Sequence, residues 1–291
     1  MKASLDCLPC VVNQALNSVS RATDDPILRE RALREVLSRL AAADYDRTPA
    51  ELSMIAHWVA QEVSGVDDPY VGEKREHNRL ALELLPELRA TVAAAEDPLL
   101  AALLLAAAGN VIDLGLNQEF DLQRDIRGQL EHGFSREEYA AFREAVAGAH
   151  QVLYIGDNAG EIVFDRLVVE QLLPREITFV VKGGPIVNDA MREDADQVGL
   201  TELVRIIDTG IGEFGFIRDH VTDECRQAFR GADLVVSKGH ANFETVSELG
   251  PEGDKAFYVV KAKCAQVARM LGVPMGGVVL LSHGTLRGGR G

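Results

Sequence analysis

The stretch VLYIGDNAGE, residues 152–161, carries the clearest fold signal in the chain. Four apolar residues lead directly into a turn with two glycines and two polar side chains, and a helix-like segment follows. An apolar run without alternation is typical of a strand buried on both faces of a parallel sheet. The later apolar runs of the same kind are 177–181, 204–207, 234–236, 257–260 and 278–281. Repetition of strand, turn and helix predicts an α/β fold, a Rossmann-like three-layer domain with a parallel sheet, over residues 149–291.

Residues 1–148 have a different character. They are rich in Leu and Ala, and Asp-Pro steps at 25–26, 68–69 and 97–98 interrupt them. A proline just inside a helix start, after an acidic cap, is a recognised N-terminal signal. We therefore expect a helical N-terminal subdomain that forms one unit with the sheet domain.

The charge balance limits the partners. The 291 residues include 30 Lys and Arg against 45 Asp and Glu, a formal charge of −15. A field of this sign repels nucleic-acid backbones and anionic lipid, so we expect neither nucleic acid nor membrane as a partner. A phosphate ligand would need a local positive device such as a metal ion, a lysine or a helix N-terminus. The oligomeric state is left open.

A cytoplasmic location is expected from three further features. The apolar segment 98–108 is shorter than the roughly 20 residues that span a bilayer. No basic region followed by an apolar run marks a secretory signal. Four cysteines are too few for a disulfide framework in a chain of this length.

Oxygen ligands follow two of the predicted strands. Asp157 and Asn158 come directly after the first strand, and Asp189 follows the second. Ligands bind at the carboxyl ends of strands in open α/β sheets, so these oxygens could converge on one cation. Oxygen donors suit Mg²⁺ or Mn²⁺ better than zinc. The alternative is that the same side chains cap the following helices.

Basic residues follow two other predicted strands. Lys238 and Gly239 come after the run 234–236, and Lys261 ends the run that begins at residue 257. An ammonium group beside free backbone amides is suited to phosphate. Two acidic and two basic strand ends together predict a metal-and-anion site, although a lysine at a strand end can also extend to solvent.

Two other polar features are less decisive. Asn110 and Asp113 form a polar island three residues apart in an apolar region, and they either line the cleft over the sheet or join helices. Cys7 and Cys10 have CxxC spacing without a second such pair, which favours packing over a zinc site. Cys225 and Cys264 are expected to be small buried hydrophobic residues.

Taken together, the motifs resemble those of the DUF89, or damage-control phosphatase (ARMT1-like), family, in particular its short prokaryotic branch with an N-terminal CxxC. The resemblance covers essentially the whole chain. Its carriers are CLPC at 7–10, AGNVID at 108–113, GDNAGE at 156–161, VNDA at 187–190, SKGHANFE at 237–244 and KAKC at 261–264.

The resemblance implies a metal-dependent phosphatase that acts on small phosphorylated metabolites with Mn²⁺, Mg²⁺, Co²⁺ or Ni²⁺. It implies metal-binding and catalytic roles for three residues: Asp157, Asn158 and Asp189. It implies substrate contacts for Lys238, Gly239, Asn242 and Lys261, to which we add Asn110 and Asp113. One departure from the family pattern is His240, which stands where longer relatives carry an acid.

Two other functions fit parts of the pattern. The glycine turn after the first strand resembles the loop of an S-adenosylmethionine-dependent methyltransferase, although it lacks a denser glycine cluster. The same metal-and-lysine site would also serve a non-enzymatic protein that binds a phosphorylated metabolite. For the phosphatase, Glu161 or Asp113 is the expected acid that protonates the leaving group.

Overall fold

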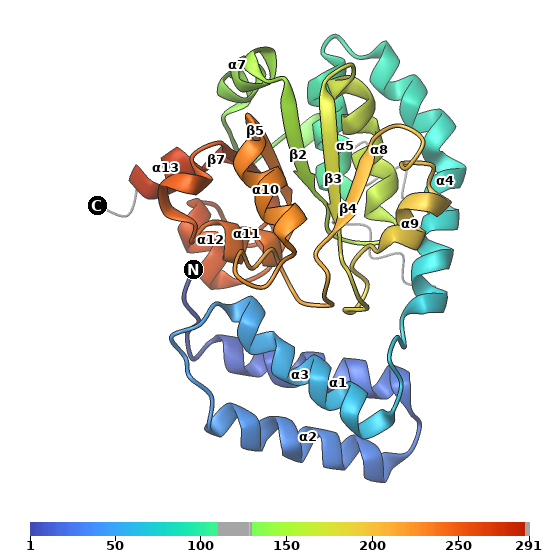
Figure 1. The fold of residues 1–291 in the computed structure, drawn as a ribbon, viewed down its shortest axis with the longest axis vertical. Coiled ribbons are helices and arrows are strands. Elements are labelled where there is room, and N and C mark those ends of the chain that lie inside the picture. The colour runs from blue at the N-terminus through green and yellow to red at the C-terminus, as the bar shows by residue number, and fades with distance from the viewer. Residues whose placement is uncertain (110–127, 129, 289–291) are drawn as a thin grey trace.

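The sheet predicted for the second half of the chain lies at the centre of the molecule (Figure 1). The computed structural model describes residues 1–109, 128 and 130–288, and within them the sheet has seven strands in the order β1-β7-β6-β5-β2-β3-β4. The six apolar runs coincide with β2 to β7 to within one or two residues. The strands are β1 Arg136–Glu137, β2 Gln151–Ile155, β3 Glu176–Val181, β4 Arg205–Asp208, β5 Leu234–Lys238, β6 Ala256–Lys261 and β7 Val278–Ser282.

One strand pair departs from the expected parallel sheet: β6 and β7 run antiparallel, while the other neighbouring pairs are parallel. A parallel connection must carry the chain back to the far end of the sheet. Here the chain re-enters where β6 ends, because the amide of Ala262 donates to Gly277 O and the amide of Gly276 donates to Ala262 O, both at 2.8 Å. The α/β architecture is confirmed, with a mostly parallel sheet.

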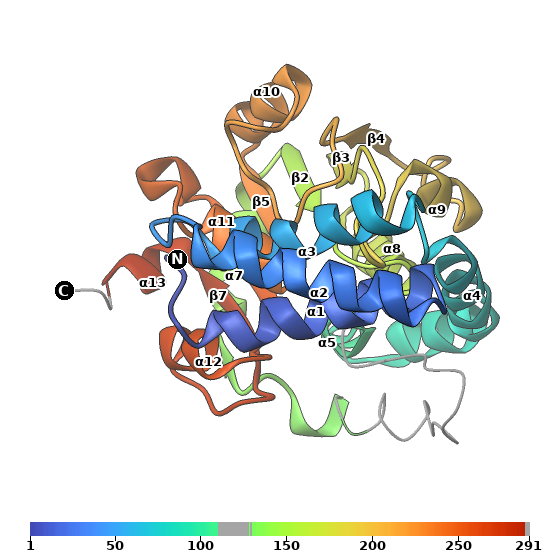
Figure 2. The ribbon, with the colours of Figure 1, turned by 90° about the horizontal axis from the view of Figure 1, so that it is seen from below.

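Helices cover both faces of the sheet (Figures 1 and 2). On one face, α4, α5, α7 and α8 pack against Val152 and Tyr154 of β2. On the other, α10 to α13 pack against Leu153 and Ile155 of the same strand. This is the period-two alternation of a strand whose faces are both buried. The helices are α4 Val71–Ala94, α5 Pro98–Gly109, α7 Tyr139–Gly148, α8 Glu161–Leu172, α9 Arg192–Gln197, α10 Asp223–Gly231, α11 His240–Val246, α12 Ala265–Leu271 and α13 His283–Gly288.

A separate layer of three helices lies across the carboxyl ends of the strands (Figure 1). It consists of α1 Cys7–Ala22, α2 Pro26–Ala41 and α3 Pro49–Ser64, which share a hydrophobic cluster of their own. Proline begins both α2 and α3. Asp25 caps α2 by accepting a hydrogen bond from the amide of Ile27, which agrees with the sequence signal.

Two polar contacts join α3 and the segment before α1 to the sheet domain. His57 Nε2 of α3 lies 3.0 Å from Pro185 O in the loop after β3. The amino group of Met1 lies 2.8 Å from the Glu248 carboxylate. The helical layer is therefore positioned over the strand ends by polar contacts as well as by packing.

The boundary predicted at residue 148 stays a prediction. The hydrophobic clusters group α4, α5 and α7 with the sheet, whereas α1 to α3 form their own cluster. The first half also supplies β1, whose two residues are exposed and therefore give no apolar run in the sequence. Across the described ranges, no helix is long and apolar enough to cross a membrane.

The packing of α5 gives a stability prediction. Leu103 of α5 is fully buried, and Leu103→Ala should lower the free energy of unfolding by about 2–5 kcal/mol because it leaves a cavity. Leu37→Ala on α2, where the side chain is 54% exposed, should cost less than about 0.5 kcal/mol. Urea denaturation followed by circular dichroism would measure both. Equal losses for the two variants would contradict this account of the core.

Candidate functional site

A cavity of about 710 Å³ lies between the helical layer and the carboxyl ends of the strands. Its floor includes Asp157, Asn158 and Asp189, and its opposite wall includes Gln14 and Arg21 of α1. Ligand sites of open α/β sheets lie at this edge. The fold therefore brings the strand-end motifs and the first helix to one space.

The turns after β2 and β3 are joined through their backbones. The amide of Ala190 donates to Asp157 O at 2.8 Å, and the amide of Ala159 donates to Asn188 O at 2.9 Å. Asn158 and Asp189 also form an isolated antiparallel bridge. The structure thus places Asp157, Asn158 and Asp189 side by side, and their role as metal ligands is a proposal taken up below.

The two aspartates are almost entirely removed from water. Asp157 is 7% exposed and Asp189 is 5% exposed. Burial raises the pKa of Asp157, and the charge of Glu161 raises it further, while Lys263, Lys238 and Lys182 oppose both effects. Burial likewise raises the pKa of Asp189 to about 7, against the attraction of Lys182 and with the repulsion of Asp157. Both carboxylates would be stabilised by an additional positive charge.

The donor set fits a hard cation. Asp189 Oδ2 is buried and accepts no hydrogen bond, and the ammonium of Lys182 lies 3.5 Å from it. The amide nitrogen of Asn158 is committed to Asp157 Oδ2 at 2.9 Å and to Glu161 Oε2 at 3.2 Å, which leaves Oδ1 as its other polar atom. Two carboxylates and an amide oxygen are ligands that Mg²⁺ and Mn²⁺ prefer.

Gly239 sets the position of Asp157. Its φ is +88°, and a Cβ built on it would lie 2.0 Å from Asp157 Oδ2. Only a glycine provides both this backbone conformation and the space for the carboxylate. Gly239 was expected to contact substrate, and the structure places it directly behind a proposed metal ligand.

Lys238 also lies behind the carboxylates rather than on the cavity wall. It is fully buried, donates to Ala106 O at 3.0 Å and to Glu161, and lies 3.3 Å from Asp165 Oδ1. Burial opposes its charge, but Asp165 and Glu161 together raise its pKa above the ordinary value. Lys238 therefore supplies charge to the site through a buried network.

The remaining expected contacts are placed as follows. Asn242 is buried and ties β2 to β5, because its amide donates to Gly156 O at 2.8 Å and to Lys238 O at 2.7 Å. Lys261 is outside the residues that line the cavity. Asn110 and Asp113 lie outside the described residues.

Other cations line the cavity instead: Arg21, His240 and Lys263. The KAKC segment contains two lysines, and the one that lines the cavity is Lys263, not Lys261, for which a substrate contact was predicted. Strand alternation does not distinguish them, because the two lysines are two residues apart. The difference is that Lys261 is the last residue of β6, on the face of Phe257 and Val259, whereas Lys263 lies beyond the strand, next to the N-cap of α12. Lys182, which faces Asp189, follows β3 and could have been found by the same rule as Lys238.

The first helix presents a polar face to the cavity. Gln14, Asn17, Ser18 and Arg21 line it with the spacing of one helix face, whereas Val11, Ala15 and Val19 pack into the helical layer. Gln14 Oε1 is buried without a hydrogen-bond partner. A buried polar oxygen without a partner is costly, so this face is suited to a polar ligand.

The cysteines differ from one another. Cys225 is buried as expected, but Cys264 is only half-buried and lines the cavity, so that its assignment as a buried hydrophobic residue is wrong. The error arises because Cys264 is the N-cap of α12 rather than part of a packed face. Cys7 and Cys10 line the same cavity. Among the described residues, no three His, Cys, Asp or Glu side chains are arranged to hold a metal ion.

Known proteins resemble this chain over nearly its whole length. Residues 3–279 match the family described as the damage-control phosphatase ARMT1-like domain. Similar sequences include a damage-control phosphatase of Pyrococcus horikoshii, 33% identical over 97% of this chain and 99% of the relative, and one of Archaeoglobus fulgidus, 33% identical over 96% and 98%. An uncharacterized protein of Methanocaldococcus jannaschii is 32% identical over 97% and 96%. The crystal structure of a DUF89 family protein from Pyrococcus horikoshii superposes with a TM-score of 0.90, at 32% identity and 97% and 99% coverage.

The contact between Gly239 and Asp157 can be tested directly. Gly239→Ala should displace the Asp157 carboxylate and weaken Mn²⁺ binding by about tenfold or more. Gly65→Ala is the matched control, because Gly65 has a φ of +71° but no atom within 4 Å of a built Cβ. Isothermal titration calorimetry would compare the two. Equal Mn²⁺ affinity in both variants would show that the contact does not position a metal ligand.

Proposed function

Because the chain belongs to the damage-control phosphatase ARMT1-like family, we propose that it hydrolyses phosphate monoesters of small polar metabolites with one divalent cation. The family resemblance and the phosphatase class inferred from the motifs are confirmed by the relatives. The metal, its ligands and the substrate contacts are the proposed part.

The observation that carries this proposal is the buried pair of carboxylates on the cavity floor. Asp157, Asn158 and Asp189 would hold the cation, which we take to be Mn²⁺, Mg²⁺, Co²⁺ or Ni²⁺ from the donor chemistry and the family. A cation bound there supplies Lewis-acid polarisation and positive charge to a phosphoryl group. Its positive charge would also weaken, at the cavity floor, the repulsion between an anionic substrate and a chain with a formal charge of −15.

The chain contributes further positive charge around this point. Lys263 lines the cavity and would bind phosphate oxygens, and His240, whose ring nitrogens face other acceptors, adds positive charge to the same cavity. Lys238 and Lys182 act from behind, through Glu161 and Asp189. Charge is thus arranged before the substrate binds, which lowers the cost of reorganisation during the reaction.

Glu161 has a positioning role in this proposal. Its carboxylate is buried, accepts from Lys238 and accepts from the Asn158 amide at 3.2 Å. A carboxylate that accepts from two donors and lies outside the residues that line the cavity is poorly placed to protonate a leaving group, the role expected for it from the sequence. It fixes the orientation of Asn158 instead.

The leaving group is proposed to lie against α1. A cavity of about 710 Å³ is much larger than a phosphate group needs, and the wall opposite the carboxylates is polar. Gln14 Oε1 lacks a partner, and the guanidinium of Arg21 lies 5.0 Å from the centre of the Tyr70 ring and 3.1 Å from Glu73. A metabolite with several hydrogen-bonding groups fits this wall better than an apolar one.

The alternatives have less support in the geometry. Gly156 belongs to the turn that suggested a methyltransferase loop. A Cβ built on it would lie 2.6 Å from the ring of Phe179, so this glycine makes room for a side chain of the protein and not for a cofactor. A non-enzymatic binding protein would use the same site, so only turnover separates it from a phosphatase. We place the protein in the cytoplasm, where its four free thiols stay reduced.

Phosphate release tests the proposed metal site. A panel of phosphorylated metabolites with Mn²⁺, Mg²⁺, Co²⁺ and Ni²⁺ should identify a substrate that the wild type hydrolyses. Asp157→Asn and Asp189→Asn should then lower kcat/KM at least about a hundredfold, since charge stabilisation of several kcal/mol is lost. Asp24→Asn, whose side chain is fully exposed, should retain wild-type activity.

Two results would contradict the proposal. Full activity of Asp157→Asn with retained metal dependence would exclude the ligand assignment. Thermal stabilisation of the wild type by phosphorylated metabolites without any release of phosphate would favour a binding protein.

Substrate size tests the role of α1. Gln14→Leu should lower kcat/KM for a polar metabolite phosphate about tenfold, the value of roughly one hydrogen bond, and leave methyl phosphate unaffected because it is too small to reach α1. Gln227→Leu on α10, outside the cavity, is the control. Equal losses for both substrates would remove Gln14 from the leaving-group site.

A further inference from the structure

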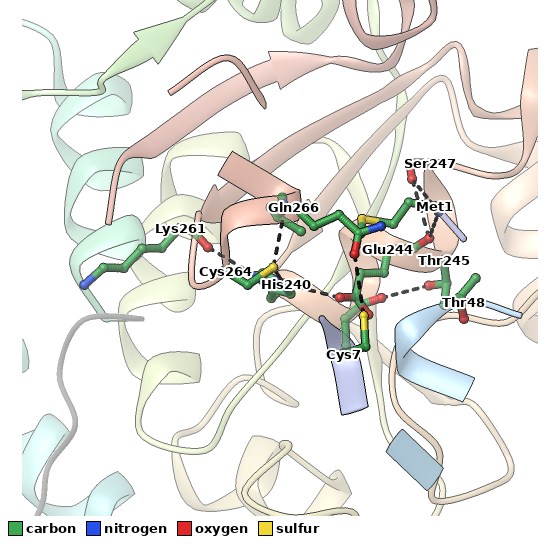
Figure 3. A network of polar contacts seen from close by, with 12 residues as sticks. Met1, Cys7, Thr48, His240, Glu244, Thr245, Ser247, Lys261, Cys264 and Gln266 are labelled. Atoms are coloured by element: carbon green, nitrogen blue, oxygen red, sulfur yellow. Dashed lines mark hydrogen bonds and ion pairs between the residues drawn. The ribbon is translucent and has the colours of Figure 1, made fainter. Parts of the chain in front are cut away.

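The thiol of Cys264, the imidazole of His240 and the carboxylate of Glu244 lie close together (Figure 3). All three residues line the cavity that the proposed metal ligands also line. Cys264 Sγ lies 3.8 Å from His240 Nε2, and Glu244 Oε1 lies 3.3 Å from the same nitrogen. On the other side of the ring, His240 Nδ1 lies 3.4 Å from Lys261 O. Both ring nitrogens therefore face acceptors, which favours the doubly protonated imidazolium.

The surroundings of Cys264 favour its anionic form. The amide of Val267 donates to Sγ at 3.4 Å, and the His240 cation faces the same sulfur. Burial raises the pKa of this thiol, but the contacts with His240 and Val267 lower it below the ordinary value. Burial lowers the pKa of His240, but its contacts with Cys264 and Glu244 raise it to about 10. A thiolate and imidazolium pair follows from this geometry.

The other thiols provide an internal contrast. Cys10 is an exposed residue. Partial burial of its thiol, together with the neighbouring Cys264 and Cys7, raises the pKa of that thiol. Cys225 is buried, its thiol donates to Asp208 O at 3.1 Å, and burial raises its pKa. Cys264 combines a cationic neighbour with a position on the cavity wall that small solutes reach.

We propose that Cys264 is a nucleophilic thiolate which hydroperoxides oxidise to a sulfenic acid, with His240 as the proton donor. The sulfur attacks the terminal peroxide oxygen, so that an S–O bond forms as the O–O bond breaks. Sulfur loses two electrons and the peroxide gains them. The hydroxide or alkoxide that leaves takes the proton from His240 Nε2 and departs as water or an alcohol.

Several charged groups face this pair and enter its pH dependence. Glu244 of α11 and Lys263 before α12 lie on the same wall, and Cys7 and Cys10 face it from α1. Gln266 Oε1 accepts from Cys7 at 3.5 Å, which links α1 to the segment that carries Cys264. The test described next removes the contact between His240 and Cys264 and leaves these neighbours unchanged.

The test is alkylation of the full chain as purified, with iodoacetamide at pH 6.5 and peptide mapping by mass spectrometry. Cys264 should react at least about tenfold faster than Cys10, even though Cys10 is more exposed, because only the thiolate is nucleophilic. After one equivalent of hydrogen peroxide, a sulfenic-acid trap such as dimedone should mark Cys264 first.

Two variants isolate the role of His240. His240→Gln should slow alkylation of Cys264 about tenfold at pH 6.5, and the rate should recover as the pH rises past about 8.5, the ordinary thiol range. His220→Gln, at an exposed histidine paired with Glu213, should leave the rate unchanged. If His240→Gln fails to fold, the wild-type pH profile at Cys264 decides, with reactivity persisting at pH 6.5 as the expected result.

Preferential labelling of Cys10 at pH 6.5, an unchanged Cys264 rate in folded His240→Gln, or absence of the trap from Cys264 would overturn the proposal. Alkylation needs neither a substrate nor turnover. Its outcome is therefore separate from that of the phosphatase assays.

Discussion

Asp157 and Asp189 lie side by side at the ends of β2 and β3, and both are nearly inaccessible to water. Two neighbouring carboxylates in such a place repel each other and lose hydration, so the folded chain must supply compensating positive charge. Lys182 and Lys238 supply it from within the protein, while Lys263 lies on the cavity side. The rest of the site is arranged around this requirement, including the glycine that leaves room for Asp157.

The charge behind the site is itself shared. Lys238 contacts Glu161 and Asp165, and Asp165 also accepts a hydrogen bond from the Tyr154 hydroxyl at 2.7 Å. Burial raises the pKa of Asp165 to about 7, against the attraction of Lys238. One ammonium group thus faces several carboxyl groups, and it cannot fully neutralise Asp157 as well. A divalent cation at the cavity floor complements this deficit, which is why the buried network and the proposed metal site depend on each other.

The strand positions could be predicted because buried strands leave continuous apolar runs, and residues 152–155 are the clearest case. The antiparallel β7 could not, because direction depends on where the chain re-enters the sheet and not on composition. The acidic strand ends were identified, since their side chains lie at the edge where parallel strands end. Lys238 was predicted to contact substrate, but it is buried and donates to Glu161 and to Ala106 O of α5, which is 132 residues away in the chain, so that no local pattern reveals its position. The polar face of α1 was missed because it becomes meaningful only when the helix is placed over the sheet.

The cavity also separates hard ligands from soft ones. Carboxylate and amide oxygens occupy its floor, whereas the thiols of Cys7, Cys10 and Cys264 lie on walls formed by α1 and the start of α12. Mg²⁺ and Mn²⁺ prefer oxygen, so the thiols would not draw them from the floor. His240 lines the same cavity and faces the Cys264 sulfur. Since the imidazolium is engaged by Cys264 and Glu244, the positive charge that it offers an entering phosphate depends on the state of that sulfur. In the proposed step the thiolate becomes a neutral sulfenic acid and His240 gives up its proton, so this wall loses one anion and one cation together. The oxidation state of Cys264 and the charge that His240 offers an entering anion are therefore coupled.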